Sequence, residues 1–216
     1  MKHNIFETRL YLSILITFAM AISICACSDA TNQKNAPVSS PAVIPAWSQE
    51  VRYEKLMQIK EVRDLVSRHA AMAKKGQSAE EFLAECDKLI PQVISTEKVG
   101  MTFNQMWASL GVKTGQERSE DLPNPPGMVI TSALCSLARN GQSLRQVRQF
   151  EDGCLLEAEL PSDFRSFAGV IYVSVRKNGT ATHIDGAILI KGQMLDWGKS
   201  KNCLEVLFAD LMATPV

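Results

Sequence analysis

The chain has no excess of charge of either sign, because 23 lysines and arginines balance 23 aspartates and glutamates. A basic surface that would hold nucleic acid through its electrostatic field is therefore not expected. The chain also has no glycine-rich phosphate loop, no calcium-binding loop and no helically spaced carboxylate pair beside a base. Hydrophobic residues make up 46% of the sequence, too many for an intrinsically disordered protein. We expect a folded protein with neither a nucleic-acid partner nor a cofactor.

Metal-binding spacings are missing from the four cysteines that follow the N-terminal segment, namely Cys86, Cys135, Cys154 and Cys203. The sequence has no C-x-x-C pair, and no histidine lies within five residues of any of the four. Structural zinc sites need ligands clustered in this way. The sequence therefore predicts no metal site.

The N-terminus has the pattern of an export signal. Lys2 and Arg9 provide a basic start, and residues 10–26 are apolar apart from three serines or threonines. A short basic region followed by an apolar one is typical of a secretory signal peptide. An uncleaved membrane-spanning helix is the alternative interpretation, since about 17 apolar residues is the lower limit for crossing a bilayer.

The apolar segment ends in Ile24-Cys25-Ala26-Cys27. A branched aliphatic residue three positions before a cysteine, with small residues between, resembles the lipobox of bacterial lipoproteins. That resemblance implies cleavage before Cys27, a diacylglycerol on its thiol and a third acyl chain, such as palmitate, on its new amine. Three chains would hold the protein on the membrane permanently. The next residue, Ser28, is not the aspartate of an inner-membrane retention signal, which implies the outer membrane, with the protein facing the periplasm.

Residues 27–46 are expected to be the lipidated cysteine and a flexible tether. The segment contains three prolines and several small polar residues, and it has no aromatic residue to bury. Nineteen residues of coil, from 28 to 46, span about 24 Å on average and roughly 65 Å when fully stretched. Trp47 marks the expected start of a periplasmic domain over residues 47–216.

Helices are predicted in the first part of this domain. Apolar residues recur at the helical period over residues 51–73, and Ser78 and Glu81 form a capping box for a second helix that ends at Pro91. Shorter helices are predicted over 102–110 and 128–139, separated by a loop over 114–127. A final amphipathic helix is predicted over 201–212, with Ser200 as its N-cap.

Strands are predicted after residue 141, where the apolar period changes to two. Residues 155–160 alternate, residues 170–176 are rich in β-branched side chains, and a partner strand runs over 180–190. Asn178-Gly179 is a strong signal for a two-residue hairpin turn. The predicted class is α+β, with N-terminal helices followed by a small antiparallel sheet that the C-terminal helix covers.

Disulfide bonds are the expected state of Cys86, Cys135, Cys154 and Cys203 in an oxidising periplasm. Four cysteines allow three pairings, and the sequence does not choose among them. We favour Cys86–Cys135 and Cys154–Cys203, since each pair stays within one half of the domain. Each would close a loop of about 50 residues, worth roughly 4 kcal/mol in the chain-entropy treatment.

The predicted hairpin gathers the only residues with catalytic potential. A turn at Asn178-Gly179 places Ser174 opposite His183 and Tyr172 opposite Asp185 on the outward face. In a hydrolase of this kind, an imidazole takes the proton of a hydroxyl, and a carboxylate orients that imidazole. Nothing nearby supplies a nucleophile turn or an oxyanion-binding amide pair. We therefore interpret this face as solvated surface.

The anchor, the tether and the missing site chemistry together favour a non-enzymatic lipoprotein that binds another protein in the cell envelope, as an accessory or an inhibitor. Two alternatives remain. One is an envelope hydrolase that uses Ser174 and His183. The other is a carrier of a small ligand or lipid, which would need an enclosed apolar cavity.

Overall fold

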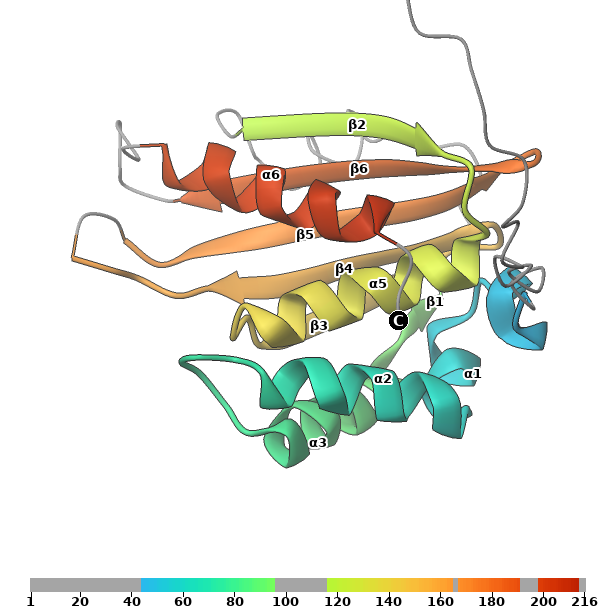
Figure 1. Ribbon diagram of the computed structural model, residues 1–216, viewed down its shortest axis with the longest axis horizontal. Helices are drawn as coiled ribbons and strands as arrows, with labels where there is room; N and C mark the ends of the chain where they lie inside the picture. Colours follow the sequence, from blue (N-terminus) through green and yellow to red (C-terminus); the bar gives the residue numbers. More distant parts are fainter. Residues whose placement is uncertain (1–43, 96–115, 165–166, 191–197, 214–216) are drawn as a thin grey trace, which may run out of the picture. The chain divides into compact units, whose positions relative to one another are not determined.

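The structure is a computed structural model that describes residues 44–95, 116–164, 167–190 and 198–213, all within one compact unit spanning 44–216 (Figure 1). In chain order, its elements are η1 (Ala46–Gln49), α1 (Tyr53–Gln58), α2 (Lys60–Ala71), α3 (Ala79–Leu89), η2 (Ile90–Gln92), β1 (Ile94–Ser95), β2 (Gln116–Leu122), α5 (Pro126–Arg139), β3 (Leu144–Gln149), β4 (Gly153–Leu160), β5 (Gly169–Asn178), β6 (Ala181–Ile190) and α6 (Lys199–Met212). The predicted signal, Cys27, residues 28–43 of the predicted tether and the predicted helix over 102–110 lie outside the described residues.

The strands form one six-stranded sheet in the order β1-β3-β4-β5-β6-β2. Every neighbouring pair from β3 to β2 is antiparallel, and the two-residue β1 joins β3 in parallel at the opposite edge. Helices packed against an antiparallel sheet make the fold α+β, which confirms the predicted class.

Two helices, α5 and α6, lie side by side along one face of the sheet, and α2 and α3 lie next to α5 on the side away from α6 (Figure 1). α5 contacts β4 and β5, α6 contacts β6 and β2, and α2 packs on α5 and α3. The close approach of α6 depends on Gly186 of β6, because a Cβ there would lie 2.7 Å from the ring of Phe208. The C-terminal helix thus covers the sheet as predicted, and α5 shares that role.

Local signals located the helices well. Ser78 caps α3 by accepting the amide of Glu81, whose side chain accepts the Ser78 amide in return. The run predicted over 51–73 is instead divided into α1 and α2 by Ile59, which has extended backbone. Ser200 lies inside α6, which begins after Gly198 rather than at a serine cap.

The segment 114–127, predicted as a loop, contains the edge strand β2. Its residues 116–122 read QERSEDL and show no apolar alternation. Pairing with β6 alone makes them a strand, from Gln116 opposite Ile188 to Leu122 opposite Thr182. Two strands of the sheet, β1 and β2, therefore precede α5 in the chain.

The β5–β6 hairpin is shifted from its predicted register by two residues. Asn178 pairs with Ala181, so the turn residues are Gly179 and Thr180. The positive φ of Gly179, 59°, suits the first central position of a tight hairpin turn. Because side chains alternate with period two, a shift of two residues keeps each one on its predicted face and changes only its cross-strand partner.

Candidate functional site

The polar residues of the hairpin share one face of the sheet, opposite the helices, but they do not pair as predicted. Ser174 lies opposite Asp185, and His183 lies opposite Arg176. Ser174 and Asp185 are both buried, so the centre of this face is not the solvated surface expected from the sequence. Ser174 and His183 are not hydrogen-bonded to each other in the described structure.

His183 instead joins two carboxylates on neighbouring strands. Its Nδ1 lies 2.8 Å from Oδ1 of Asp121 on β2, and its Nε2 lies 3.2 Å from Oδ1 of Asp185 on β6. The same oxygen of Asp185 accepts a hydrogen bond from the Ser119 hydroxyl at 2.5 Å. The result is a chain of contacts that links Ser119 and Asp121 of the edge strand to the body of the sheet.

The electrostatics of this cluster favour charged imidazole. Burial lowers the pKa of His183, but the hydrogen bond with Asp121 and the negative charge of Asp185 outweigh it, so the pKa is raised overall. The hydrogen bond from His183 in turn lowers the pKa of Asp121.

Both ring nitrogens of His183 face carboxylates, which leaves neither free to take a proton from a serine hydroxyl. Ser119 donates to Asp185, not to the imidazole, so the order of groups is not that of a hydrolytic triad. The cluster of Ser119, Asp121, His183 and Asp185, which we call the clasp, holds the polar edge strand β2 against β6.

The same face carries a small apolar cluster beside the clasp, made of Phe150, Leu155, Tyr172 and Ala187. The Arg176 guanidinium lies over the Phe150 ring, 4.3 Å from its centre. Apolar side chains and an arginine thus lie together on this face, which the sequence pattern predicted to be solvated surface.

Cys86, Cys135 and Cys154 have free thiols, so neither Cys86–Cys135 nor Cys154–Cys203 is formed in the structure. Burial raises the pKa of Cys86, Cys135 and Cys154 to about 12 in each case. They pack as small apolar side chains in the core. Their surroundings differ: Cys86 lies beside Tyr53, whereas the charges of Arg68, Arg139 and Asp210 act on Cys135.

Sequence reasoning missed a cavity of about 460 Å³ at the end of the molecule where α6 begins. Its walls come from the turn after α2, the end of α5, the end of β4 and the first turns of α6. The lining residues that matter most are Lys75, Gln142, Asp163, Lys199, Asn202 and Cys203. No local pattern could have revealed it, because four separate segments contribute to it.

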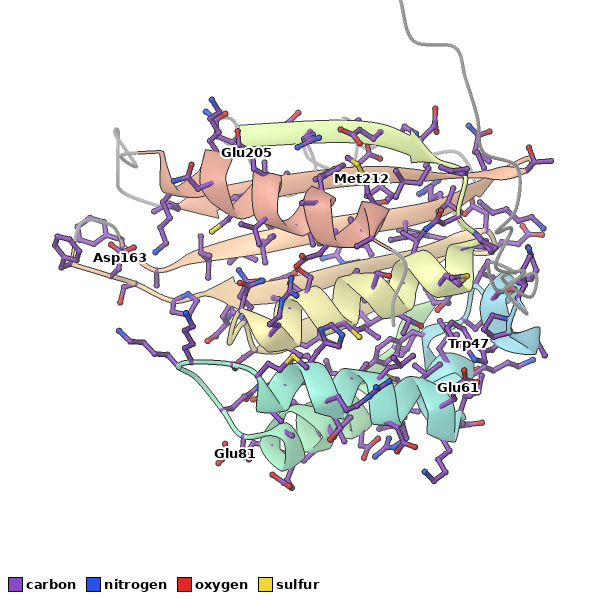
Figure 2. All side chains as sticks on the ribbon, viewed as in Figure 1. Trp47, Glu61, Glu81, Asp163, Glu205 and Met212 are labelled. Carbon is purple, nitrogen blue, oxygen red and sulfur yellow. The ribbon has the colours of Figure 1, made fainter. Side chains whose placement is uncertain are left out.

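Two charged residues of the cavity, Lys199 and Asp163, form an ion pair. Lys199 Nζ donates to the carbonyl of Pro161 at 2.5 Å and lies 3.3 Å from Asp163 Oδ2. Figure 2 shows Asp163 at the end of the molecule where α6 starts, whereas Met212 lies at the opposite end of α6. The cavity is partly open, unlike the enclosed space that a lipid carrier needs.

Among the described residues, no group of three His, Cys, Asp or Glu side chains could hold a metal ion. Within the same residues, every helix is too short or too polar to cross a membrane. Comparison with known protein families, with curated proteins and with solved structures finds no match to this chain.

Proposed function

We propose that the protein is a lipoprotein anchored to the outer membrane through Cys27, and that its α+β domain binds another protein of the cell envelope. The binding surface is the end of the domain that carries the segment between β4 and β5, and we refer to it as the loop end. The proposal treats the chain as a binding module and assigns it no reaction.

The observation that carries the proposal is the exposure of two phenylalanines at the loop end. Phe164 is 89% exposed and Phe167 is 61% exposed, only three positions apart in the chain. Large aromatic side chains gain most from burial at a partner surface, and they dominate interface energetics.

The cavity supports a protein rather than a lipid as the partner. Pro161 and Asp163, which immediately precede Phe164, form part of its wall. Its buried lysine and amide side chains need polar partners, which lipid chains do not supply. A tether of the length proposed for residues 28–46 would let the loop end reach such a partner away from the membrane.

Site-specific photocross-linking in intact cells tests this proposal. Benzoylphenylalanine is placed at Phe164, and at Met212 as the matched control. Met212 is also an exposed apolar residue, but it lies at the other end of α6 (Figure 2). We expect irradiation to give one discrete protein adduct from position 164 and not from position 212.

The adduct should disappear when Phe167→Ser is added, and it should survive Met212→Ser. An adduct of phospholipid mass would show that the loop end contacts the membrane instead. The same protein adducts from both positions, or none from position 164, would overturn the proposal.

The anchor has a separate test. The wild-type N-terminal peptide should carry three acyl chains on Cys27, and Cys27→Ala should release the protein from the membrane fraction. An unmodified Cys27 thiol in the wild-type protein would contradict the lipoprotein assignment.

A further inference from the structure

We propose that the cavity at the start of α6 binds the carboxylate end of a peptide, an inference that rests on the proposed function and names the part of the partner that is recognised. The required ligand chemistry is a terminal carboxylate beside an amide and an apolar side chain. Either a protein C-terminus or a free short peptide has that chemistry.

The charge of the cavity favours an anion. Two lysines, Lys75 and Lys199, line it against a single carboxylate, Asp163. The Lys199 side chain is only 14% exposed, and its ammonium contacts one carbonyl and one carboxylate, which leaves a third N–H to donate. Lys75, at the rim, takes part in no ion pair with another described residue. α6 also begins here, so its positive end adds to the same potential.

The Gln142 side chain provides the second, independent observation. Gln142 is only 6% exposed and lines the cavity, and its side chain forms no hydrogen bond with another described residue. Its amide can therefore donate a hydrogen bond to a bound ligand and accept one from it. A peptide bond offers a donor and an acceptor. Asn202 lines the same cavity and can extend this recognition.

Apolar side chains complete the match. Leu160, Val206 and Leu207 line the cavity beside the polar groups. A volume of about 460 Å³ lies within the range of pockets that hold small ligands. An inorganic anion would contact neither these apolar walls nor Gln142. A peptide whose last residue is apolar would contact the lysines through its carboxylate, Gln142 through its peptide bond and the apolar walls through its side chain.

The experiment uses the full-length protein in detergent micelles and two probes, N-acetyl-leucyl-leucine and its C-terminal carboxamide. Binding is measured by calorimetry and by protection of Cys203 from N-ethylmaleimide. Cys203 reports on the site because it lines the cavity and is partly exposed, whereas Cys86, Cys135 and Cys154 are buried. We expect the acid to slow alkylation of Cys203 at least tenfold at saturation, and the carboxamide to bind at least tenfold more weakly.

Variants of the two lysines and of Gln142 test whether the probe binds in this cavity. Lys199→Met and Gln142→Leu should each weaken binding of the acid at least tenfold. Lys75→Met tests the same charge at the exposed rim, where folding is not at risk. Lys201→Met is the matched control, since Lys201 lies on the same helix outside the cavity and pairs with Glu205. It should bind like wild type.

Equal binding of acid and carboxamide, or equal losses in Lys199→Met and Lys201→Met, would overturn the inference. So would failure of both probes to bind wild-type protein. If the probes fail but the cross-link at Phe164 forms, only this inference is wrong. If the acid binds but no protein adduct forms in cells, the ligand is a free peptide and the protein-partner proposal fails instead.

Discussion

The imidazole of His183 on β6 lies 2.8 Å from the carboxylate of Asp121 on the edge strand β2. The Nε2 atom of the same ring contacts Asp185 of β6, so His183 links β2 to β6 through two carboxylates. Strand β2 has few buried side chains, and only its last residue, Leu122, is fully buried. The clasp therefore makes an ionic contribution to an edge that the hydrophobic core holds weakly.

His183→Asn should destabilise the protein in a pH-dependent way. The pKa of His183 is raised on folding, so its contribution is complete below about pH 6.5 and is lost as the pH rises through the folded value. The pKa of Asp121 is lowered, so its contribution is lost only in acid. Thermal unfolding should show the variant a few degrees less stable than wild type near pH 6, and nearly equal to it at pH 9.

In the control, His69→Gln, the stability difference from wild type should change with pH in the opposite direction. Burial first, and then the charge of Arg139, lower the pKa of His69. Its Nδ1 is buried without a hydrogen-bond partner. Protonation therefore opposes folding, and wild type should lose stability relative to His69→Gln as the pH falls below about 6.5. If both variants gave the same pH profile, the assignment of the clasp would be wrong.

Gln149→Leu should cost about 2–3 kcal/mol of unfolding free energy, roughly 5–10 °C in thermal midpoint. The Gln149 amide nitrogen lies within 3.0 Å of the carbonyls of Val51, Phe150 and Gly153, and its oxygen accepts the amide of Tyr53. It thereby ties the start of the domain to the sheet. Gln146→Leu on the same strand is the control, because among the described residues Gln146 accepts hydrogen bonds only from the partly exposed Arg148. Equal losses in urea unfolding would contradict this role.

Gly127→Ala should destabilise the protein by about 1–3 kcal/mol, although alanine normally stabilises a helix relative to glycine. A Cβ at Gly127 would lie 2.4 Å from the carbonyl oxygen of Trp47 and 2.8 Å from that of Glu50. These are backbone atoms, so the first turn of α5 or η1 would have to move. Gly179→Asn has open space and tolerates the positive φ, so its unfolding midpoint should stay close to wild type.

Alkylation of the folded protein distinguishes free thiols from the predicted disulfides. With iodoacetamide at pH 8, Cys203 should react first, because burial holds the pKa of the other three thiols near 12. All four should react after denaturation without reductant. If protein isolated from the periplasm shows no reactive thiol even when denatured, then Cys86, Cys135, Cys154 and Cys203 are paired there, as the sequence predicts.

Local patterns were sufficient for the elements that local interactions stabilise. The capping box of Ser78 and Glu81 and the apolar stripe of the last helix act within a few residues, so both were correctly placed from the sequence. Period-two alternation likewise assigned Val173 and Val175 to the core face and Ser174 to the opposite one.

What only the tertiary structure decided depends on contacts between distant segments. Residues 116–122 become a strand because β6 supplies their hydrogen bonds, some 65 positions later. That pairing brings Asp121 to His183 and Ser119 to Asp185. The shifted register of β5 and β6 separates Ser174 from His183, whose ring lies between two acids instead. The cavity likewise exists only where four segments meet. Side-chain periodicity encodes which face a residue takes, but register and neighbours depend on how the whole core packs.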